Sequence, residues 1–204
     1  PNIDGVNRYI EKLEPFWQEG DNVNDAFYVD SGLAANFAEA TETVYGLDHL
    51  EGQSVVGLAD GIAFGYETLV VVENGAITLP NGPASKIRVG LDFQAFGETL
   101  DIEAGAGDGT AQGKTKRLHN ISMRVWETSV SGEFGVFDQM YNTYYWTPVS
   151  QQQDLGAEQL VTRVLEPIIP EGVNDVRGSI AFRRVRPYPM NVVGIYPQLH
   201  TQDR

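Results

Sequence analysis

Three dipeptides that favour a left-handed backbone divide the first half of the chain into short β-prone runs. They are Asp60-Gly61, Asn74-Gly75 and Asn81-Gly82. Each supplies the positive-φ residues that a tight hairpin turn requires. Asn74-Gly75 lies between residues 68–72 and 76–79, which are rich in Val, Leu, Ile and Thr. This spacing predicts a hairpin with a two-residue turn.

Further strands are predicted by alternating or β-branched patterns. Apolar and polar residues alternate in two stretches, and two later stretches are β-prone: residues 86–91, 121–126, 176–185 and 190–196. Pro187 and Pro189 predict an extended connection between the last two stretches, because proline fixes its own φ and restricts the residue before it.

Helical patterning is weak. Ile10, Leu13 and Trp17 have helical spacing, but Pro15 limits any helix there to a turn or two. Residues 158–166 suit either a helix or a strand, and their Val and Thr content favours the strand. We therefore expect an all-β fold with little helix, in which a small β-barrel or sandwich block packs against further antiparallel strands.

Two boundaries divide the sequence, one near Gly46 and one in the Gly-rich residues 105–113. Residues 1–45 are expected to form an irregular acidic leader and connection, in which the Ala-rich residues 34–43 make a surface excursion. Residues 46–113 are expected to form the small barrel or sandwich block, and residues 114–204 the C-terminal antiparallel region. A block as small as the middle one is marginal alone, so it should pack against the C-terminal strands.

Charge excludes several classes of function. The chain has 28 acidic and 14 basic residues and a net charge of −14. A protein that grips DNA through its phosphates needs the opposite excess. The imbalance is confined to residues 1–113, which hold nineteen acids and four bases, whereas residues 114–204 hold nine acids and ten bases. The asymmetry indicates either a solvated acidic face or a surface that meets a partner.

The sequence also lacks residues and motifs that several kinds of functional site require. The chain has no Cys, which removes disulfides, thiolate zinc sites, iron–sulfur clusters and thiol nucleophiles. The sequence contains no run of eighteen or more apolar residues, so it does not predict a membrane-spanning helix. Gly113-Lys114-Thr115 resembles the end of a phosphate-binding loop, but the motif needs Gly where Asp108 stands, and a strand rather than a helix is predicted to follow.

Catalytic and metal-binding patterns are sparse. The three histidines, at positions 49, 119 and 200, are far apart in sequence and lack a neighbouring acid at ligand spacing. We therefore expect neither a metal nor another cofactor. Asp101 and Glu103 would point to one side of a strand and could form a glycosidase pair, although solvated carboxylates are common in so acidic a chain.

Two clusters are candidates for contacts with other molecules. Tyr141, Tyr144, Tyr145 and Trp146 could stack on sugars, anchor a protein interface or pack as ordinary strand residues. The basic run at 183–186 could form salt bridges between subunits or guard a solvated edge strand. The candidate subunit-interface residues are Arg183, Arg184, Arg186, Tyr144, Tyr145 and Trp146.

Several segments together carry a resemblance to a known family. They include DAFYVDSGL (25–33), GLDHLEGQSV (46–55), LADG (58–61), VENG (72–75), GTAQGKTKR (109–117) and PMNVVGIYPQL (189–199). In combination the chain resembles the tail nozzle or tail-hub proteins of short-tailed bacteriophages, the tail tubular protein B-like family, over most of its length. Members of that family are longer, so the resemblance implies a C-terminal portion of a nozzle subunit. The absence of an initiating Met agrees with that expectation.

The resemblance implies a structural role. The chain would belong to the virion, in the phage tail, after synthesis in the bacterial cytoplasm. Copies of it would assemble into a ring, commonly six-fold, with other tail and adaptor proteins, and would form part of the genome-ejection conduit without catalysis or specific DNA binding. Two alternatives from other classes stay open: a cell-wall or polysaccharide hydrolase using Asp101 and Glu103, and a carbohydrate-binding β-sandwich using Tyr144, Tyr145 and Trp146.

Overall fold

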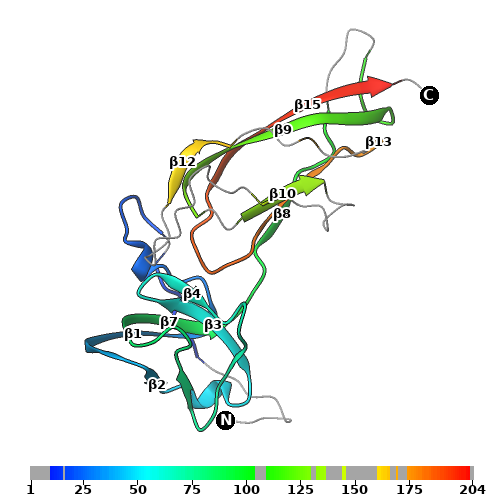
Figure 1. The fold of residues 1–204 in the computed structure, drawn as a ribbon. Coiled ribbons are helices and arrows are strands. Elements are labelled where there is room, and N and C mark those ends of the chain that lie inside the picture. The colour runs from blue at the N-terminus through cyan, green and yellow to red at the C-terminus, as the bar shows by residue number, and fades with distance from the viewer. Residues whose placement is uncertain are drawn as a thin grey trace.

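The fold is all-β, as the sequence predicts. The computed structural model describes residues 10–15, 17–103, 109–129, 132–136, 144–145, 160–165, 169 and 174–202. In these residues helix is limited to two 3₁₀ turns, η1 (Val23–Asp25) and η2 (Asp48–Leu50), and every strand pair is antiparallel. Figure 1 shows two groups of strands, one at each end of an elongated molecule.

The first group, the N-terminal block, is built from seven strands. They are β1 (Asp30–Thr41), β2 (Thr43–Tyr45), β3 (Ser54–Ala59), β4 (Ile62–Phe64), β5 (Val70–Val71), β6 (Ala76–Thr78) and β7 (Ala84–Leu91). One sheet has the order β1-β7-β3-β4, with β5 also paired to β3, and β2 and β6 form a separate two-stranded ribbon.

The core of the N-terminal block draws buried side chains from every strand except β1. Val44 of β2, Val55 of β3 and Ile77 of β6 are buried together with Ile87 and Val89 of β7. The alternation in residues 86–91 therefore predicts correctly which side chains of β7 face the core.

Two of the three turn dipeptides have both residues at positive φ, but the expectation for Asn81-Gly82 was wrong: only Gly82 has positive φ, and no hairpin forms there because β6 pairs with β2 while β7 pairs with β1 and β3. The hairpin at Asn74-Gly75 is also shorter than expected. Asp60 and Gly61 both have positive φ, and they join β3 to β4 in a regular hairpin. Asn74 and Gly75 also have positive φ, but only one bridge, from Glu73 to Ala76, closes their turn. Beyond that bridge the two arms diverge, because β5 pairs with β3 while β6 pairs with β2.

The expectation of a surface excursion at residues 34–43 was wrong for most of that segment, which belongs to β1. Asn36 pairs with Lys86 and Thr41 with Ala84, so β1 advances five residues while β7 advances two. Residues 37–40 therefore bulge out of the ladder, and they are exposed. The polar, Ala-rich composition of residues 34–43 therefore reflects a bulge within β1, and the strand continues on both sides of it.

Arg88 departs from the half-buried pattern expected for β7, because it is buried although it points away from the core. Its guanidinium donates hydrogen bonds to the carbonyl of Ala35, the side-chain oxygen of Asn36 and the carboxylate of Asp25. The Nζ of Lys86 binds the same carboxylate at 2.9 Å. These contacts fix η1, which carries Asp25, against the sheet.

The Glu51 carboxylate closes the Asn74-Gly75 turn from outside. It accepts hydrogen bonds from both backbone N–H groups, at 2.9 and 2.7 Å, and these bonds lower the pKa of Glu51 below its ordinary value of 4.5. Glu51→Gln is therefore expected to destabilise the fold at pH 7. Because the folded-state pKa is depressed, the carboxylate's contribution is fully present above pH 4.5 and is lost as the pH falls through the lower folded-state value.

Urea denaturation across this pH range measures the effect. The difference between wild type and Glu51→Gln should be largest at neutral pH and should disappear in acid. Glu73→Gln is a matched control in the same turn, because no hydrogen-bond partner of the Glu73 side chain occurs among the described residues. A Glu51→Gln deficit that stayed constant with pH would contradict the capping role.

The second group, the C-terminal block, is a pair of packed sheets. Its strands are β8 (Phe96–Glu98), β9 (Thr115–Thr128), β10 (Gly132–Val136), β11 (Tyr144–Tyr145), β12 (Val161–Val164), β13 (Asn174–Asp175), β14 (Ile180–Arg184) and β15 (Val192–Gln202). One sheet has the order β11-β10-β14-β8, and the other has β12-β9-β13 with β15 also paired to β9.

Side chains from both sheets fill the space between them. Ile121 and Met123 of β9 meet Phe134 of β10 and Ile180 of β14, and all four are almost completely buried. The predicted strands at 121–126 and 190–196 are confirmed by β9 and β15, and the preference for strand in residues 158–166 is confirmed by β12.

The change from one block to the other follows β7 directly. Leu91 ends β7, whereas β8, which starts at Phe96, pairs with β14 of the C-terminal block. Of the Gly-rich residues 105–113, only 109–113 are among those described. On the other side, residues 30–45, which the sequence assigns to a leader, provide β1 and β2 of the N-terminal block.

Candidate functional site

The predicted basic run lies on β14 and the residues that follow it, and its first member is neutralised within the chain. Arg183 stands directly opposite Glu133 in the β10–β14 ladder, and its Nε donates a hydrogen bond to the Glu133 carboxylate. The Glu133 side chain is only 2% exposed, so this pair is mostly withdrawn from water. Loss of Arg183 would leave a buried carboxylate without its partner cation.

Arg184 is the centre of the contact between the two blocks. Its two terminal nitrogens donate hydrogen bonds to the carbonyls of Tyr28, at 2.9 Å, and Phe93, at 3.1 Å. The guanidinium also lies over both rings, with its Cζ 5.2 Å from the Tyr28 centroid and 4.5 Å from the Phe93 centroid. Arg184 is 5% exposed. Its guanidinium therefore has little surface left to offer a second subunit.

Burial around Arg184 shifts the pKa of three groups, and it raises that of the Tyr28 hydroxyl although the Arg184 cation opposes the shift. Burial lowers the pKa of the Arg184 guanidinium, and the neighbouring Tyr66, Asp92 and Tyr28 groups oppose that shift. Burial also raises the pKa of the Tyr66 hydroxyl well above its ordinary value, with the Asp92 carboxylate adding to the effect. Tyr66 donates a hydrogen bond to Asp92 at 3.1 Å, so it acts as a neutral donor here.

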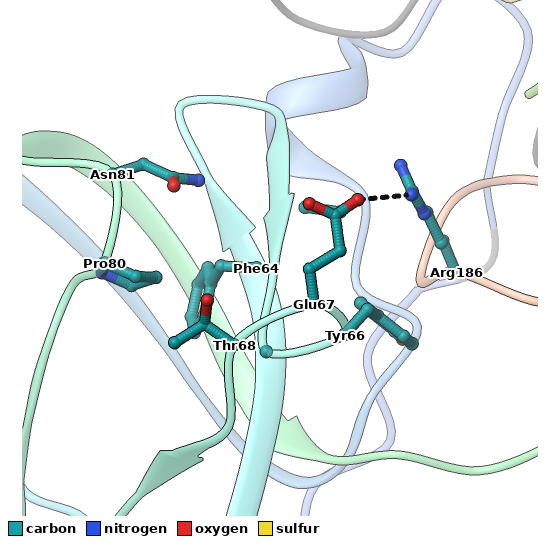
Figure 2. A pocket seen from close by; sticks show the side chains of 9 residues that line it. Phe64, Tyr66, Glu67, Thr68, Pro80, Asn81 and Arg186 are labelled. Carbon is teal, nitrogen blue, oxygen red and sulfur yellow. Dashed lines mark hydrogen bonds and ion pairs between the residues drawn. The ribbon is translucent and has the colours of Figure 1, made fainter.

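Arg186 reaches from the C-terminal block to the N-terminal one. It pairs with Glu67 at 3.2 Å, and both side chains remain substantially exposed. Figure 2 shows this pair at the rim of a shallow hollow that Phe64, Thr68 and Pro80 also line. The hollow measures about 80 Å³. Sites for small molecules usually enclose roughly 300 Å³ or more, so this hollow is too small for a substrate of ordinary size.

Tyr188 is a junction residue that sequence reasoning missed. Its hydroxyl accepts a hydrogen bond from the Ala63 N–H at 2.9 Å and donates one to the Gly61 carbonyl at 3.0 Å. The side chain is 3% exposed and packs with Leu58 and Ala26 in a third hydrophobic cluster. Tyr188 therefore inserts from the C-terminal block into the β3–β4 hairpin. The expectation that the flanking prolines impose an extended connection was wrong, because residues 186–188 bend and the Tyr188 N–H donates a hydrogen bond to the Arg186 carbonyl at 2.7 Å.

The aromatic candidates can be placed only in part. Tyr144 and Tyr145 form β11, where they pair with Phe134 and Glu133 of β10. Their side chains, and the whole of Tyr141 and Trp146, lie outside the described residues. Their assignment to a subunit interface stays a prediction.

The predicted carboxylate pair is engaged in structural contacts. Asp101 accepts a hydrogen bond from Arg177 at 3.3 Å. Glu103 accepts hydrogen bonds from the Thr110 hydroxyl and the Ala111 N–H, and these lower the pKa of Glu103. A glycosidase acid needs the opposite shift, toward a raised pKa. The geometry therefore gives no support to acid catalysis by Glu103.

Two of the three histidines come together, although 81 positions separate them in sequence. The His119 and His200 rings lie 6.4 Å apart on the exposed side of β9 and β15. His49 instead contacts the Ser31 carbonyl through Nε2, at 2.7 Å. Across the described ranges, no three His, Asp or Glu side chains are grouped so that they could hold a metal ion.

Two further expectations can be compared with the backbone. The segment after Gly113-Lys114 is a strand, β9, and not the helix that a phosphate-binding loop requires. Residues 10–15 contain no helix, in agreement with the limit that Pro15 sets. Within the part of the chain that the structure describes, no helix has the length and apolar character needed to cross a bilayer.

Negative charge predominates on the N-terminal block, whose two basic residues, Lys86 and Arg88 of β7, both bind Asp25. Residues 13–85 contain twelve acids and no Lys or Arg. Most of these acids are exposed, and Glu19, Glu39, Glu42, Asp48 and Glu73 have no hydrogen-bond or ion-pair partner for their side chains among the described residues. This surface is therefore strongly negative.

No protein-family model matches the sequence, and a search of the curated proteins finds no match either.

Proposed function

We propose that this chain is a structural subunit of a bacteriophage tail, in a nozzle or hub ring that forms part of the genome-ejection conduit. The observation that carries the proposal is the negative surface of the N-terminal block: residues 13–85 hold twelve acids and no Lys or Arg, and the two bases that follow, Lys86 and Arg88, both bind Asp25. An acidic wall repels phosphates, whereas a basic wall would hold DNA in a salt-dependent way. The sequence resemblance to nozzle proteins supports the same role.

The proposal assigns the chain a mechanical task without a catalytic step. Its copies would form a closed ring, commonly six-fold, in contact with adaptor and other tail proteins, while DNA passes without specific binding. Two observations agree with that task. The basic side chains Arg184 and Arg186 hold the two blocks of one chain together, and the candidate carboxylates Asp101 and Glu103 accept hydrogen bonds from neighbouring residues.

Ejection kinetics test the proposed conduit. In the phage that encodes this chain, replacing Glu19, Asp30 and Glu39 together by Lys should slow DNA release several-fold at low ionic strength. The slowing should weaken as salt is added, because attraction between lysine and phosphate is salt-dependent. The same three positions changed to Gln remove charge without adding a base, and they should have a smaller effect. Unchanged release from the Lys variant would count against an acidic conduit wall.

A further inference from the structure

The exposed face of β9 and β15 carries cations that form no ion pair with any residue that the structure describes. Arg117 stands opposite His200 in the ladder, and Arg124 opposite Gly194. Residues paired in this way share one face of a sheet. Their neighbours Ile121, Met123 and Val125 are buried on the other face, against the core. We call this outer surface, with Arg117, His119, Arg124, Tyr196 and His200, the basic sheet face.

Few carboxylates occur in the described strands of the sheet that carries the basic sheet face. Across the described strands of this sheet, carboxylates occur at two positions: Glu127, at the end of β9, accepts hydrogen bonds from Trp17 and Gly20, and Asp175 of β13 stands opposite Lys116 in the ladder. Neither Arg117 nor Arg124 forms an ion pair with any described residue. Tyr196 is 50% exposed on the same face. The surface therefore combines unpaired positive charge with exposed aromatic area, as protein interfaces often do.

A complementary surface surrounds the β2–β6 ribbon. Glu42 lies at one end of this ribbon, where its carbonyl accepts a hydrogen bond from the Leu79 N–H. Asp48 and Glu73 lie at the other end, beside Gly75, and the Asp48 carboxylate packs closely against this glycine. We call this surface the acidic end.

The acidic end also combines unpaired charge with exposed aromatic area. The carboxylates of Glu42, Asp48 and Glu73 have no partner among the described residues. Tyr45 of β2 is 72% exposed beside them.

The two surfaces lie at opposite ends of the molecule. In Figure 1, β2 and η2 are at the lower end of the N-terminal block, whereas β9 and β15 form the upper end of the C-terminal block. The basic sheet face therefore cannot reach the acidic end of its own chain, but it can reach that of a second copy. A contact between two different patches of identical subunits is heterologous, and repetition of it produces a ring or a filament.

We propose that the basic sheet face of one copy binds the acidic end of the next copy. This contact rests on the proposed function, in which copies of the chain assemble, and it names the surfaces that meet. It differs from the contact expected for Arg183, Arg184 and Arg186, which are bound within their own chain. Sedimentation of the full 204-residue chain at low ionic strength should show association above the monomer mass of 22.5 kDa that weakens as salt is added.

Charge reversal on either surface tests the contact. Arg117→Glu with Arg124→Glu should weaken self-association on the order of tenfold, because like charges then meet, and so should Glu42→Lys with Glu73→Lys. A mixture of the two double variants should associate again, since the reversed sheet face of one fits the reversed end of the other. The quadruple variant should associate with itself for the same reason.

Matched controls separate this contact from net charge. Lys12→Glu changes the net charge as much as either arginine reversal alone, and Glu14→Lys with Glu19→Lys matches the glutamate pair. Both controls should associate like wild type. If a reversed variant does not fold, the milder Arg117→Gln with Arg124→Gln should still weaken association.

Three results would overturn the contact: a wild type that stays monomeric at low salt, reversed variants that associate normally, or reversed variants that do not recover on mixing. Binding of duplex DNA that is lost with Arg117→Glu and Arg124→Glu would assign the face to nucleic acid and would also overturn it. These failures would leave the proposed place in the tail intact, because ejection kinetics and imaging of the tail test that place independently.

Discussion

Replacing Tyr188 by alanine is expected to lower the free energy of unfolding by about 3–5 kcal/mol, the usual cost of removing a buried aromatic side chain. The side chain fills the third hydrophobic cluster together with Leu58 and Ala26. Its hydroxyl also satisfies the Ala63 N–H and the Gly61 carbonyl. Both losses fall on the contact between the blocks, so the variant should also unfold less cooperatively.

Tyr188→Phe separates the two contributions. It keeps the ring but leaves the Ala63 N–H and the Gly61 carbonyl without their partner, which should cost about 1–3 kcal/mol. Tyr45→Ala is the control, because Tyr45 is 72% exposed and surface changes usually stay within about 0.5 kcal/mol. Urea denaturation followed by tryptophan fluorescence measures all three variants. A Tyr188→Ala variant as stable as Tyr45→Ala would contradict the assignment of Tyr188 to the junction.

Arg184→Ala is expected to destabilise the chain by about 3 kcal/mol, because two part-buried carbonyls lose their donors and two aromatic rings lose the cation that lies over them. The carbonyls belong to Tyr28 and Phe93, and so do the rings. Arg184→Lys should recover little of this loss, since an ammonium cannot reproduce the planar fork that reaches both carbonyls.

Arg186→Ala provides a control from the same segment. Its pair with Glu67 is exposed, and exposed pairs are worth at most about 1 kcal/mol. The comparison also tests whether Arg184 is a structural or an intersubunit residue. An intersubunit residue would change association and leave monomer stability intact. Equal stability of the Arg184→Ala and Arg186→Ala variants would therefore contradict the structural role.

Local signals in the sequence predict the strands and turns well. The Asp60-Gly61 turn and the alternation around Ile87 and Met123 are determined by neighbours a few residues away, and the structure confirms them. The sequence predicts less well which strands pair with each other, because pairing depends on segments that are far apart in the chain. The Asn74-Gly75 turn forms as expected, yet β6 takes β2 as its partner and β5 takes β3.

The contacts of the candidate site residues are even harder to predict from the sequence, because their partners are far away in the chain. The basic run at 183–186 is visible in the sequence, but its partners are not: Tyr28 is 156 positions from Arg184, and Glu67 is 119 positions from Arg186. A charged run can face solvent, a second chain or the same chain, and composition alone does not distinguish these. The sequence also does not show that the His119 and His200 rings lie close together, because only the β9–β15 ladder brings them near each other.

Electron cryomicroscopy of the phage tail that contains this chain tests the proposed function most directly. The account predicts a closed ring of identical copies around a central channel, with the carboxylates of the N-terminal block on the channel wall and β-rich density throughout. A tail in which this chain is absent, or in which it stands as a separate peripheral domain with a sugar or cell-wall fragment bound, would contradict the account.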